Sequence, residues 1–553
     1  MSYLIKQTSK GILIKFYTAV TTLFQENNDV QNTASTLLAR RKKLLLICIL
    51  LLAFVMRFMH ISGPYTDIAA WRQCSVAMMA QNYYENNTSI LYPQINWSGP
   101  GPGYNGREFQ TVSYIASILY RIVGQRDSVG RLVALCFGIW GIYALYRLVK
   151  LVWNENQALA AAAIMAVMPI AVFVERAFLP DPAMVSMVTT GLWMFMTYLQ
   201  TEKRKHLILA TLALCLGFLT KITGMLTGLA LIYALIIYLK SKEPFKIKDI
   251  LPFAVAGVII SGIVAAYYSW AHHLSVSYPP YHFAGEGNWV WNHGLTSWLS
   301  QGYFVHILFY IIHSWMWGWP ILILFGIGFI HFFLPLNEKD AARFAHSKYK
   351  LFFHYWIIGF LFFYLIGAKE LLDNFWNFHI VSPAIAAFSG RALVLLGTQF
   401  SKRTLTISLR FALLISFITF LNMGTLKNLY HPYYGADYRM GKAINNLKKT
   451  NDLVITLGEQ IGSPVAIFYS RSKGWVFPPA GDIDWDSLPE DDATAINYLT
   501  ELKKQGAAWF GINVIHLQAI REQLPVFFEY LSKHSILKKE TEEFTIFQLE
   551  KFN

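Results

Sequence analysis

The chain has 553 residues, of which 55% are hydrophobic, 16% are aromatic and only 14% are charged. Such an apolar composition excludes an ordinary soluble enzyme and predicts an integral membrane protein. The formal net charge of +14 would suggest nucleic-acid binding in a soluble chain, but most basic residues stand in short segments between apolar runs, where they act as topology signals. We therefore expect the chain to contact a lipid bilayer and no nucleic acid.

The N-terminal segment 1–43 is basic and amphipathic, and it ends in the sequence Ala-Arg-Arg-Lys-Lys. It is too long and too basic for a cleaved signal peptide, and no small-residue cleavage site follows the first apolar run. We expect this segment to lie on the cytoplasmic surface of the membrane, and we expect the apolar run behind it to be retained as an anchor.

A helix that crosses a membrane needs about 20 apolar residues, although shorter and longer spans occur. About eleven runs fit this pattern, at 44–61, 129–149, 157–175, 183–200, 206–220, 223–240, 250–271, 315–335, 351–367, 378–397 and 405–424. If residues 39–43 are cytoplasmic and the spans alternate, every segment on the cytoplasmic side carries Lys or Arg, which satisfies the positive-inside rule. An odd number of spans then places the C-terminus outside.

Two long segments fall on the outer side, at 62–128 and 272–314. Within the first, residues 109–124 carry apolar side chains at helical spacing but are too polar to cross a membrane easily, and residues 68–84 have a similar pattern. We interpret both as helices that lie in the outer interface. After about residue 428 strand and helix patterns alternate, which predicts a small α/β domain.

The predicted fold class is a polytopic α-helical membrane protein of about eleven spans, with outer interfacial helices and a small C-terminal α/β domain. Its predicted divisions are a cytoplasmic amphipathic segment at 1–43, a transmembrane catalytic domain at 44–427 and an extracytoplasmic domain at 428–553.

The outer segments should contain few Lys and Arg residues, yet several occur there. Lys221 is the clearest case, because it stands in the very short connection between the apolar runs 206–220 and 223–240. Its side chain could simply extend to the membrane boundary, at little cost. Alternatively it could hold an anion, and a lipid-linked phosphate is the natural anion at the outer face, where Lys and Arg are its usual ligands.

Three carboxylates accompany these cations. Asp67 begins the first outer helix, Glu108 begins the second, and Asp181 is flanked by prolines at the mouth of two spans. Each could have only a structural role, as a helix cap or as a charge that favours the helix dipole. Their convergence on one membrane face favours chemistry, because a general base must reach a hydroxyl and a phosphate leaving group needs fixed cations.

These residues belong to motifs in a fixed order, which are DIAAWRQCSVAMMAQNYYEN at 67–86, REFQTVSYIASILYRIVG at 107–124, GRLVALCFG at 130–138, ERAFLPDPAMVSM at 175–187, LGFLTKITG at 216–224 and DNFWNFHIVSP at 373–383. In these motifs, over about residues 44–390, the chain resembles the GT-C-fold glycosyltransferases that use polyprenyl-phosphate sugars. This family includes the protein O-mannosyltransferases, the lipid A aminoarabinose transferases and their bacterial relatives.

The resemblance implies that Asp67 acts as general base on the acceptor hydroxyl, and that Lys221 and Arg131 lie near the lipid phosphate. Arg72 and Gln73 match a pair found in the bacterial subgroup. The remaining substrate-binding candidates are Arg176, Glu108 and Asp181.

The two acids among them, Glu108 and Asp181, match residues that shape the acceptor or metal region of the family, so a divalent metal ion is an open alternative. Two departures keep the metal and the acceptor undetermined. Many relatives have an acidic pair where this chain has Asp67-Ile68, and the segment 373–383 lacks their H-x-Y-Y pattern.

Other motifs are less informative. The residues Asp482, Asp484 and Asp486 form two D-x-D pairs, which bind a metal and a diphosphate in nucleotide-sugar enzymes. The predicted topology places them outside the cell, where nucleotide sugars are absent, so we interpret them as a solvated acidic loop. Four histidines in or beside the second long outer segment lack the pairing of a metal motif; they are His272, His273, His282 and His293.

The sequence therefore predicts a glycosyltransferase of the bacterial cytoplasmic membrane, with a cytoplasmic N-terminus and a periplasmic C-terminal domain. It would transfer a sugar from a polyprenyl-phosphate donor to a hydroxyl of an envelope glycan, lipid or protein, with inversion at the anomeric carbon. The alternatives are a lipid or sugar transporter or flippase, for which mid-span charges and inverted repeats would be typical, and a catalytically inactive sensor or scaffold. The sugar, the prenyl chain and the acceptor stay open.

Overall fold

The computed structural model describes residues 39–242, 246–279, 312, 316–332, 348–367, 371, 374–399, 404–479 and 487–551. The predicted amphipathic helix before residue 39 lies outside these residues. By its internal contacts the chain forms two units, Met1–Leu52 and Ala53–Asn553. Residues 39–58 are helical, and the second unit contains the elements described below.

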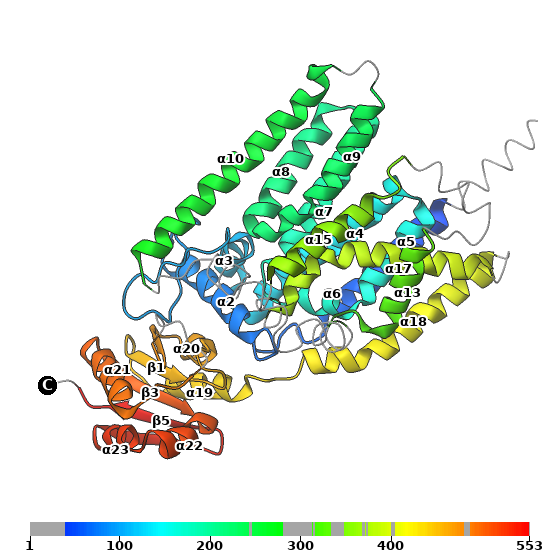
Figure 1. Ribbon diagram of the computed structural model, residues 1–553. Helices are drawn as coiled ribbons and strands as arrows, with labels where there is room; N and C mark the ends of the chain where they lie inside the picture. The colour runs from blue at the N-terminus through cyan, green and yellow to red at the C-terminus, as the bar shows by residue number, and fades with distance from the viewer. Residues whose placement is uncertain are drawn as a thin grey trace, which may run out of the picture. The chain divides into compact units, whose positions relative to one another are not determined.

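The apolar part of the second unit is helical (Figure 1). Its first elements are α2 (Ala70–Glu85), α3 (Thr111–Val123), α4 (Asp127–Val152), α5 (Glu155–Val167), α6 (Pro169–Val174), α7 (Asp181–Thr201), α8 (Arg204–Thr220), the 3₁₀ helix η1 (Ile222–Thr227), α9 (Gly228–Lys240) and α10 (Ile247–Ser277). They are followed by α13 (Gly318–Ile330), α15 (Phe352–Gly367), the 3₁₀ helix η5 (Phe375–Val381), α17 (Ser382–Gln399) and α18 (Thr404–Leu429).

Among the described residues, five helices are long and apolar enough to cross a membrane; they are Asp127–Val152, Ile222–Lys240, Ile247–Ser277, Phe375–Gly397 and Phe411–Leu429. Their burial differs widely. Of the residues in the most apolar stretch of each helix, 11% are buried in α10 and 83% in Phe375–Gly397. An apolar helix with so little burial needs a lipid environment. The structure is therefore that of a helical membrane protein, while the predicted count of about eleven spans and their sidedness stay predictions.

One predicted span is divided in the structure. The apolar run 157–175 forms two helices, α5 and α6, because Met168 takes an extended conformation in front of Pro169. A proline disfavours helical geometry in the residue before it and cannot donate a backbone hydrogen bond. α6 ends at Val174 and leads into the segment 175–180, which carries two charged residues, Glu175 and Arg176.

Helix α2, predicted to lie in the membrane interface, is buried along almost its whole length. It packs against α3 on one side and against α20 (Val465–Ser470) on another. Its low amphipathicity agrees with this position, because a helix covered on several sides has no solvent-facing stripe.

The C-terminal part contains a five-stranded sheet in the order β2-β1-β3-β5-β4. Its strands are β1 (Leu453–Leu457), β2 (Gly474–Val476), β3 (Ala507–Asn513), β4 (Ser535–Glu540) and β5 (Phe544–Leu549). β2, β1 and β3 are parallel, whereas β5 is antiparallel to both β3 and β4. These strands lie in the region after residue 428 where the sequence predicts alternating strands and helices.

Five helices cover this sheet (Figure 1). Alternate residues of β1 point to opposite faces, as the strand period requires: Val454 packs in a core with α19 (Gly435–Leu447) and α20, and Ile455 packs in a second core. The helices of the second core are α21 (Asp492–Lys504), α22 (Val514–Gln523) and α23 (Pro525–Lys533). The first core also includes residues of α2 and α3, so the C-terminal sheet and the first outer segment share one apolar interior.

Backbone hydrogen bonds reinforce this shared core. The amide of Gly99 donates to the Gly474 carbonyl at 2.8 Å, and the Gly474 amide donates to Asn96 at 2.9 Å. These contacts add a short piece of the first outer segment to the edge at β2. Gly99 has φ of +88°, and a Cβ there would meet the Trp475 indole at 2.8 Å, so glycine is needed for this close approach.

Candidate functional site

Asp67 is the centre of a buried polar cluster in the turn before α2. Only 4% of the residue is exposed. One carboxylate oxygen accepts hydrogen bonds from the Gln73 amide at 2.7 Å and from the backbone N–H of Ala69 at 3.1 Å. The other accepts from the Arg176 guanidinium at 2.9 Å, and Arg131 lies 3.6 Å from it. A buried carboxylate requires such partners, since an unpaired buried charge is strongly unfavourable.

The two arginines also hold the backbone that leads to Asp67. Arg131, in α4, donates to the carbonyls of Gly63 and Pro64, the latter at 3.0 Å. Arg176 donates to the His60 carbonyl at 3.1 Å, and its guanidinium lies 4.2 Å from the centre of the Tyr430 ring. The planar, many-donor guanidinium is suited to such bridging. The conformation of residues 60–67 thus depends on α4 and on the segment after α6.

Gln73 links this turn to the same segment. Its side-chain amide donates to Asp67, and its side-chain oxygen accepts from the backbone N–H of Phe178 at 3.2 Å. Small residues in α4 allow the segment to approach. A Cβ on Gly130 would lie 2.3 Å from the Phe178 ring, and one on Gly138 would lie 2.6 Å from the Cβ of Glu175. The site therefore depends on glycine at both positions.

Lys221 forms a second polar cluster, at the bend between α8 and η1. Its ammonium donates to Asp181 at 2.7 Å and to the side-chain oxygen of Asn377 at 2.5 Å. The lysine side chain is 16% exposed, whereas that of Asp181 is 1% exposed. Within the described part of the chain, the second carboxylate oxygen of Asp181 is buried without a hydrogen-bond partner. An ammonium has three donors, and these two contacts use only two of them.

Glu108 and Arg72 lie close to the Lys221 cluster. The backbone N–H of Phe109 donates to the Leu219 carbonyl at 3.0 Å, and the Thr111 and Thr220 hydroxyls are 2.6 Å apart. The Glu108 carboxylate pairs with the Arg72 guanidinium.

These charges act on the titration of Glu108. Burial alone would raise the pKa of Glu108, but the positive charges of Arg72, Arg107 and Lys221 outweigh it and lower the pKa below its ordinary value. Glu108 therefore stays ionised. Its charge and that of Lys221 lie close enough to interact electrostatically.

A buried ion-pair group that the sequence reasoning missed lies behind Asp67. The Glu175 carboxylate accepts from Arg57 at 2.7 Å and lies 3.2 Å from the Nε2 atom of His379. Arg57 also donates to the Met165 and Ala166 carbonyls, at 3.0 and 2.9 Å. Arg57 itself was the available signal, because it is a charged residue inside an apolar run. A charged side chain is energetically unfavourable inside a membrane, so its presence predicts a partner of opposite charge.

The structure thus brings the predicted site residues together in two groups. Asp67, Gln73, Arg131 and Arg176 form the first, and Lys221, Asp181, Glu108 and Arg72 are in the second or beside it. Arg131, predicted near the lipid phosphate, contacts Asp67 and the carbonyls of Gly63 and Pro64. Of the secondary motifs, Asp482, Asp484, Asp486, His282 and His293 lie outside the described residues.

The two acids proposed as metal candidates do not fit a divalent ion. Glu108 pairs with a guanidinium and Asp181 with an ammonium, and each of these cations would repel a metal ion bound to the same carboxylate. Over the ranges that the structure describes, no group of three His, Cys, Asp or Glu side chains is arranged to hold a metal.

Comparison with known proteins shows a likeness to one family. The family model of the dolichyl-phosphate-mannose-protein mannosyltransferases matches residues 111–270. This range contains Arg131, Arg176, Asp181 and Lys221. No curated protein matched the sequence.

Solved structures share the fold over almost the whole chain. ArnT from Cupriavidus metallidurans in the apo state is 15% identical, with a TM-score of 0.59, and the match covers 91% of this chain and 97% of that one. The same protein bound to undecaprenyl phosphate is 14% identical, with a TM-score of 0.57 and the same coverage.

An archaeal relative of the fold is larger. The Archaeoglobus fulgidus oligosaccharyltransferase, in complex with Zn and sulfate, is 11% identical with a TM-score of 0.54, and the match covers 91% of this chain and 73% of that one. The resemblance predicted from the ordered motifs is confirmed by these comparisons. The chain therefore has the GT-C fold of these membrane glycosyltransferases, and residues 111–270 match the mannosyltransferase family model.

Proposed function

We propose that the chain transfers a sugar from a polyprenyl-phosphate donor to a hydroxyl of an envelope acceptor, at the outer face of the bacterial cytoplasmic membrane. The observation that carries the proposal is the convergence of Asp67, Glu108, Asp181 and Lys221 from distant parts of the sequence into two neighbouring charged groups. The family match and the undecaprenyl phosphate named for the ArnT complex support a lipid phosphate as the donor group.

Asp67 is proposed as the general base. Its Oδ2 atom accepts one hydrogen bond, from Arg176, which leaves the second lone pair for an acceptor hydroxyl. As Asp67 takes the proton, the hydroxyl oxygen forms a bond to the anomeric carbon of the donor sugar. The bond from that carbon to the phosphate oxygen breaks, and its electron pair leaves with the polyprenyl phosphate. A single displacement of this kind inverts the configuration at the anomeric carbon.

Lys221 and Arg72 are the proposed phosphate ligands. Lys221 keeps one N–H for a phosphate oxygen beyond its contacts with Asp181 and Asn377. Arg72 has a buried terminal nitrogen without a hydrogen-bond partner among the residues that the structure describes. Such fixed donors stabilise charge that develops on the leaving group. Arg131 and Gln73 would instead hold Asp67 in place, since their contacts are with Asp67, the neighbouring backbone or Phe178.

The test is a transfer assay with purified protein and a polyprenyl-phosphate sugar, in detergent and without an ion gradient. The proposal expects release of polyprenyl phosphate together with a glycosylated product, and it expects no release with Asp67→Asn. In liposomes, movement of intact donor between leaflets without cleavage would contradict it and favour the transporter alternative. Mass spectrometry of envelope glycans with and without the gene would then identify the acceptor.

A further inference from the structure

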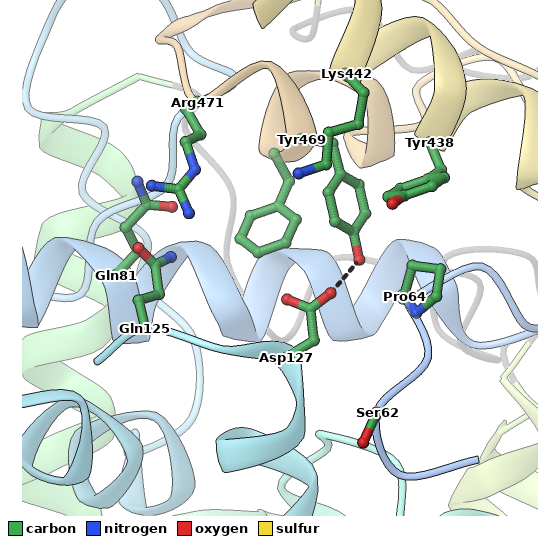
Figure 2. A pocket seen from close by; sticks show the side chains of 10 residues that line it. Ser62, Pro64, Gln81, Gln125, Asp127, Tyr438, Lys442, Tyr469 and Arg471 are labelled. Atoms are coloured by element: carbon green, nitrogen blue, oxygen red, sulfur yellow. Dashed lines mark hydrogen bonds between the residues drawn. The ribbon is translucent and has the colours of Figure 1, made fainter. Parts of the chain in front are cut away.

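A polar pocket of about 250 Å³ lies between the first outer segment and the C-terminal sheet (Figure 2). Its lining residues are Ser62, Pro64, Gln81, Gln125 and Asp127 from the first outer segment and α4, and Tyr438, Lys442, Phe468, Tyr469 and Arg471 from the C-terminal part. Ligand pockets generally measure about 300–1,000 Å³. This pocket is therefore suited to a single saccharide unit rather than to a long chain.

Two cations face the pocket from the C-terminal part. Figure 2 shows Lys442 and Arg471 extending from there toward Asp127, Gln81 and Gln125. Within the described ranges, neither side chain forms a hydrogen bond or an ion pair, and Lys442 lies beside the Tyr438 and Tyr469 rings, at 6.0 and 5.9 Å. Both cations act on the Asp127 carboxylate from a longer distance, so their N–H donors remain available to an anionic ligand.

The position of Arg471 is costly for the backbone. It ends α20 with φ of +52° and ψ of 40°, the left-handed conformation. For a residue other than glycine this conformation is unfavourable, because Cβ comes too close to the following carbonyl oxygen. Glycine would remove the cost but would also remove the guanidinium. This strain supports a role for the side chain beyond ending the helix.

The acidic residue of the pocket is already occupied. The Asp127 carboxylate accepts a hydrogen bond from the Tyr469 hydroxyl at 2.8 Å, and the charges of Arg131, Lys442 and Arg471 all act on it. With one carboxylate against the charges of Lys442 and Arg471, the pocket lining carries a net positive charge. The amides of Gln81 and Gln125 and the hydroxyls of Ser62 and Tyr438 add neutral groups suited to sugar hydroxyls.

The floor of the pocket is connected to the proposed base. The Tyr469 hydroxyl accepts from the backbone N–H of Tyr65 at 2.6 Å, and the Tyr65 hydroxyl donates to the Asp127 carbonyl at 2.8 Å. The adjacent Thr66 carbonyl accepts from the backbone N–H of Tyr434 at 3.0 Å. Asp67 follows directly. The residues that line the pocket therefore also hold the turn that carries Asp67.

We propose that this pocket binds an anionic saccharide unit of the acceptor, in which a phosphate or carboxylate group is held by Lys442 and Arg471 and the sugar hydroxyls are held by the glutamine amides. This inference rests on the proposed function, because it assigns a chemical class to the acceptor of that reaction. Nothing else in the proposed mechanism requires Lys442 or Arg471.

Calorimetric titration of the full-length protein in detergent tests the pocket without turnover. The probes are glucose 6-phosphate, glucuronate, inorganic phosphate, uncharged glucose and a short acidic peptide. We expect the two charged sugars to bind more tightly than the other three probes. In the double variant Lys442→Gln, Arg471→Gln their affinity should fall about tenfold or more, the effect of losing charge-assisted hydrogen bonds.

A matched double variant, Lys449→Gln with Arg521→Gln, removes two positive charges from the same part of the chain outside the pocket and should leave the affinity unchanged. Equal binding by the wild type and the pocket variant would overturn the proposal, as would tighter binding of phosphate alone, of glucose or of the acidic peptide. The two proposals can fail separately. If the wild type and the variant Asp67→Asn both bind the charged sugars but the wild type transfers no sugar, the proposed function fails and the pocket proposal stands.

Discussion

The Arg176 guanidinium lies 2.9 Å from the Asp67 carboxylate, although 109 residues separate them in the sequence. Arg176 follows α6, and Asp67 lies in the turn before α2. The contact orients the buried carboxylate and partly neutralises it. It also makes the position of the proposed base depend on the segment that follows α6, where Arg176 stands.

Replacement of Asp67 by asparagine should lower sugar transfer by about a hundredfold or more, the usual scale for loss of a general base. The amide retains the shape of the side chain and one acceptor oxygen, but it cannot take the proton. Initial rates with excess donor would measure the effect, with thermal unfolding as a check on folding. The control is Glu202→Gln, which changes an acid that pairs with Lys242 and is far from Asp67 in the sequence. Near-normal turnover would remove Asp67 from the chemistry.

Replacement of Lys221 by alanine should weaken donor binding by about tenfold or more, because a charge-assisted hydrogen bond to phosphate would be lost. Equilibrium binding of a radiolabelled polyprenyl-phosphate sugar measures the change. Lys240→Ala, at the end of α9, serves as the matched control. If the Lys221 variant binds donor as the wild type does, the lysine has only the structural pairing with Asp181 or extends to the membrane boundary.

The variant Gly138→Ala should lower both stability and turnover. Its Cβ would lie 2.6 Å from the Cβ of Glu175, so the segment with Glu175 and Arg176 would have to move away from α4. Overpacking of this kind costs about 1–3 kcal/mol. Thermal unfolding and transfer rates would be compared with Gly257→Ala in α10, where the described structure has no atom within 4 Å of the added Cβ. Equal behaviour of the two variants would show that the close approach is unimportant.

Stability should fall as the pH rises from about 4 to about 7 because of Asp437, in α19. Burial raises its pKa from 3.8 to about 7, despite hydrogen bonds from the Ser463 hydroxyl and the Glu459 backbone. In this pH range the folded state holds a proton that the unfolded state has released, so the free energy of unfolding decreases as the pH increases. The loss is complete above the folded-state pKa.

Thermal unfolding of the C-terminal part at pH 5 and pH 8 would measure this dependence. Asp437→Asn stays neutral and should reduce the difference between the two pH values. Glu542→Gln, at an exposed carboxylate of the same part, should not. An unchanged pH dependence in the Asn variant would assign it to other groups.

The sequence by itself determined the membrane class, the helices of the apolar runs and the strands β1 and β3, because these depend on local composition and on period. It also indicated Asp67 and Lys221, since a charge beside an apolar run is costly unless it has a role or a partner. The ordered motifs were sufficient to predict the resemblance to the GT-C glycosyltransferases that the comparisons confirm.

Only the tertiary structure decided which charges meet. Arg131 was expected beside the phosphate, yet it lies against Asp67 and the carbonyls of Gly63 and Pro64. Arg57, Glu175 and His379 form a buried group that no local pattern joins. The burial of α2 depends on a core shared with residues some 400 positions later, as the contact between Tyr65 and Tyr469 illustrates with a separation of 404 residues. Such pairings form where segments far apart in the sequence pack together. A buried charge needs a partner there because the local dielectric is low, and the spacing of residues along the chain does not predict which partner it finds.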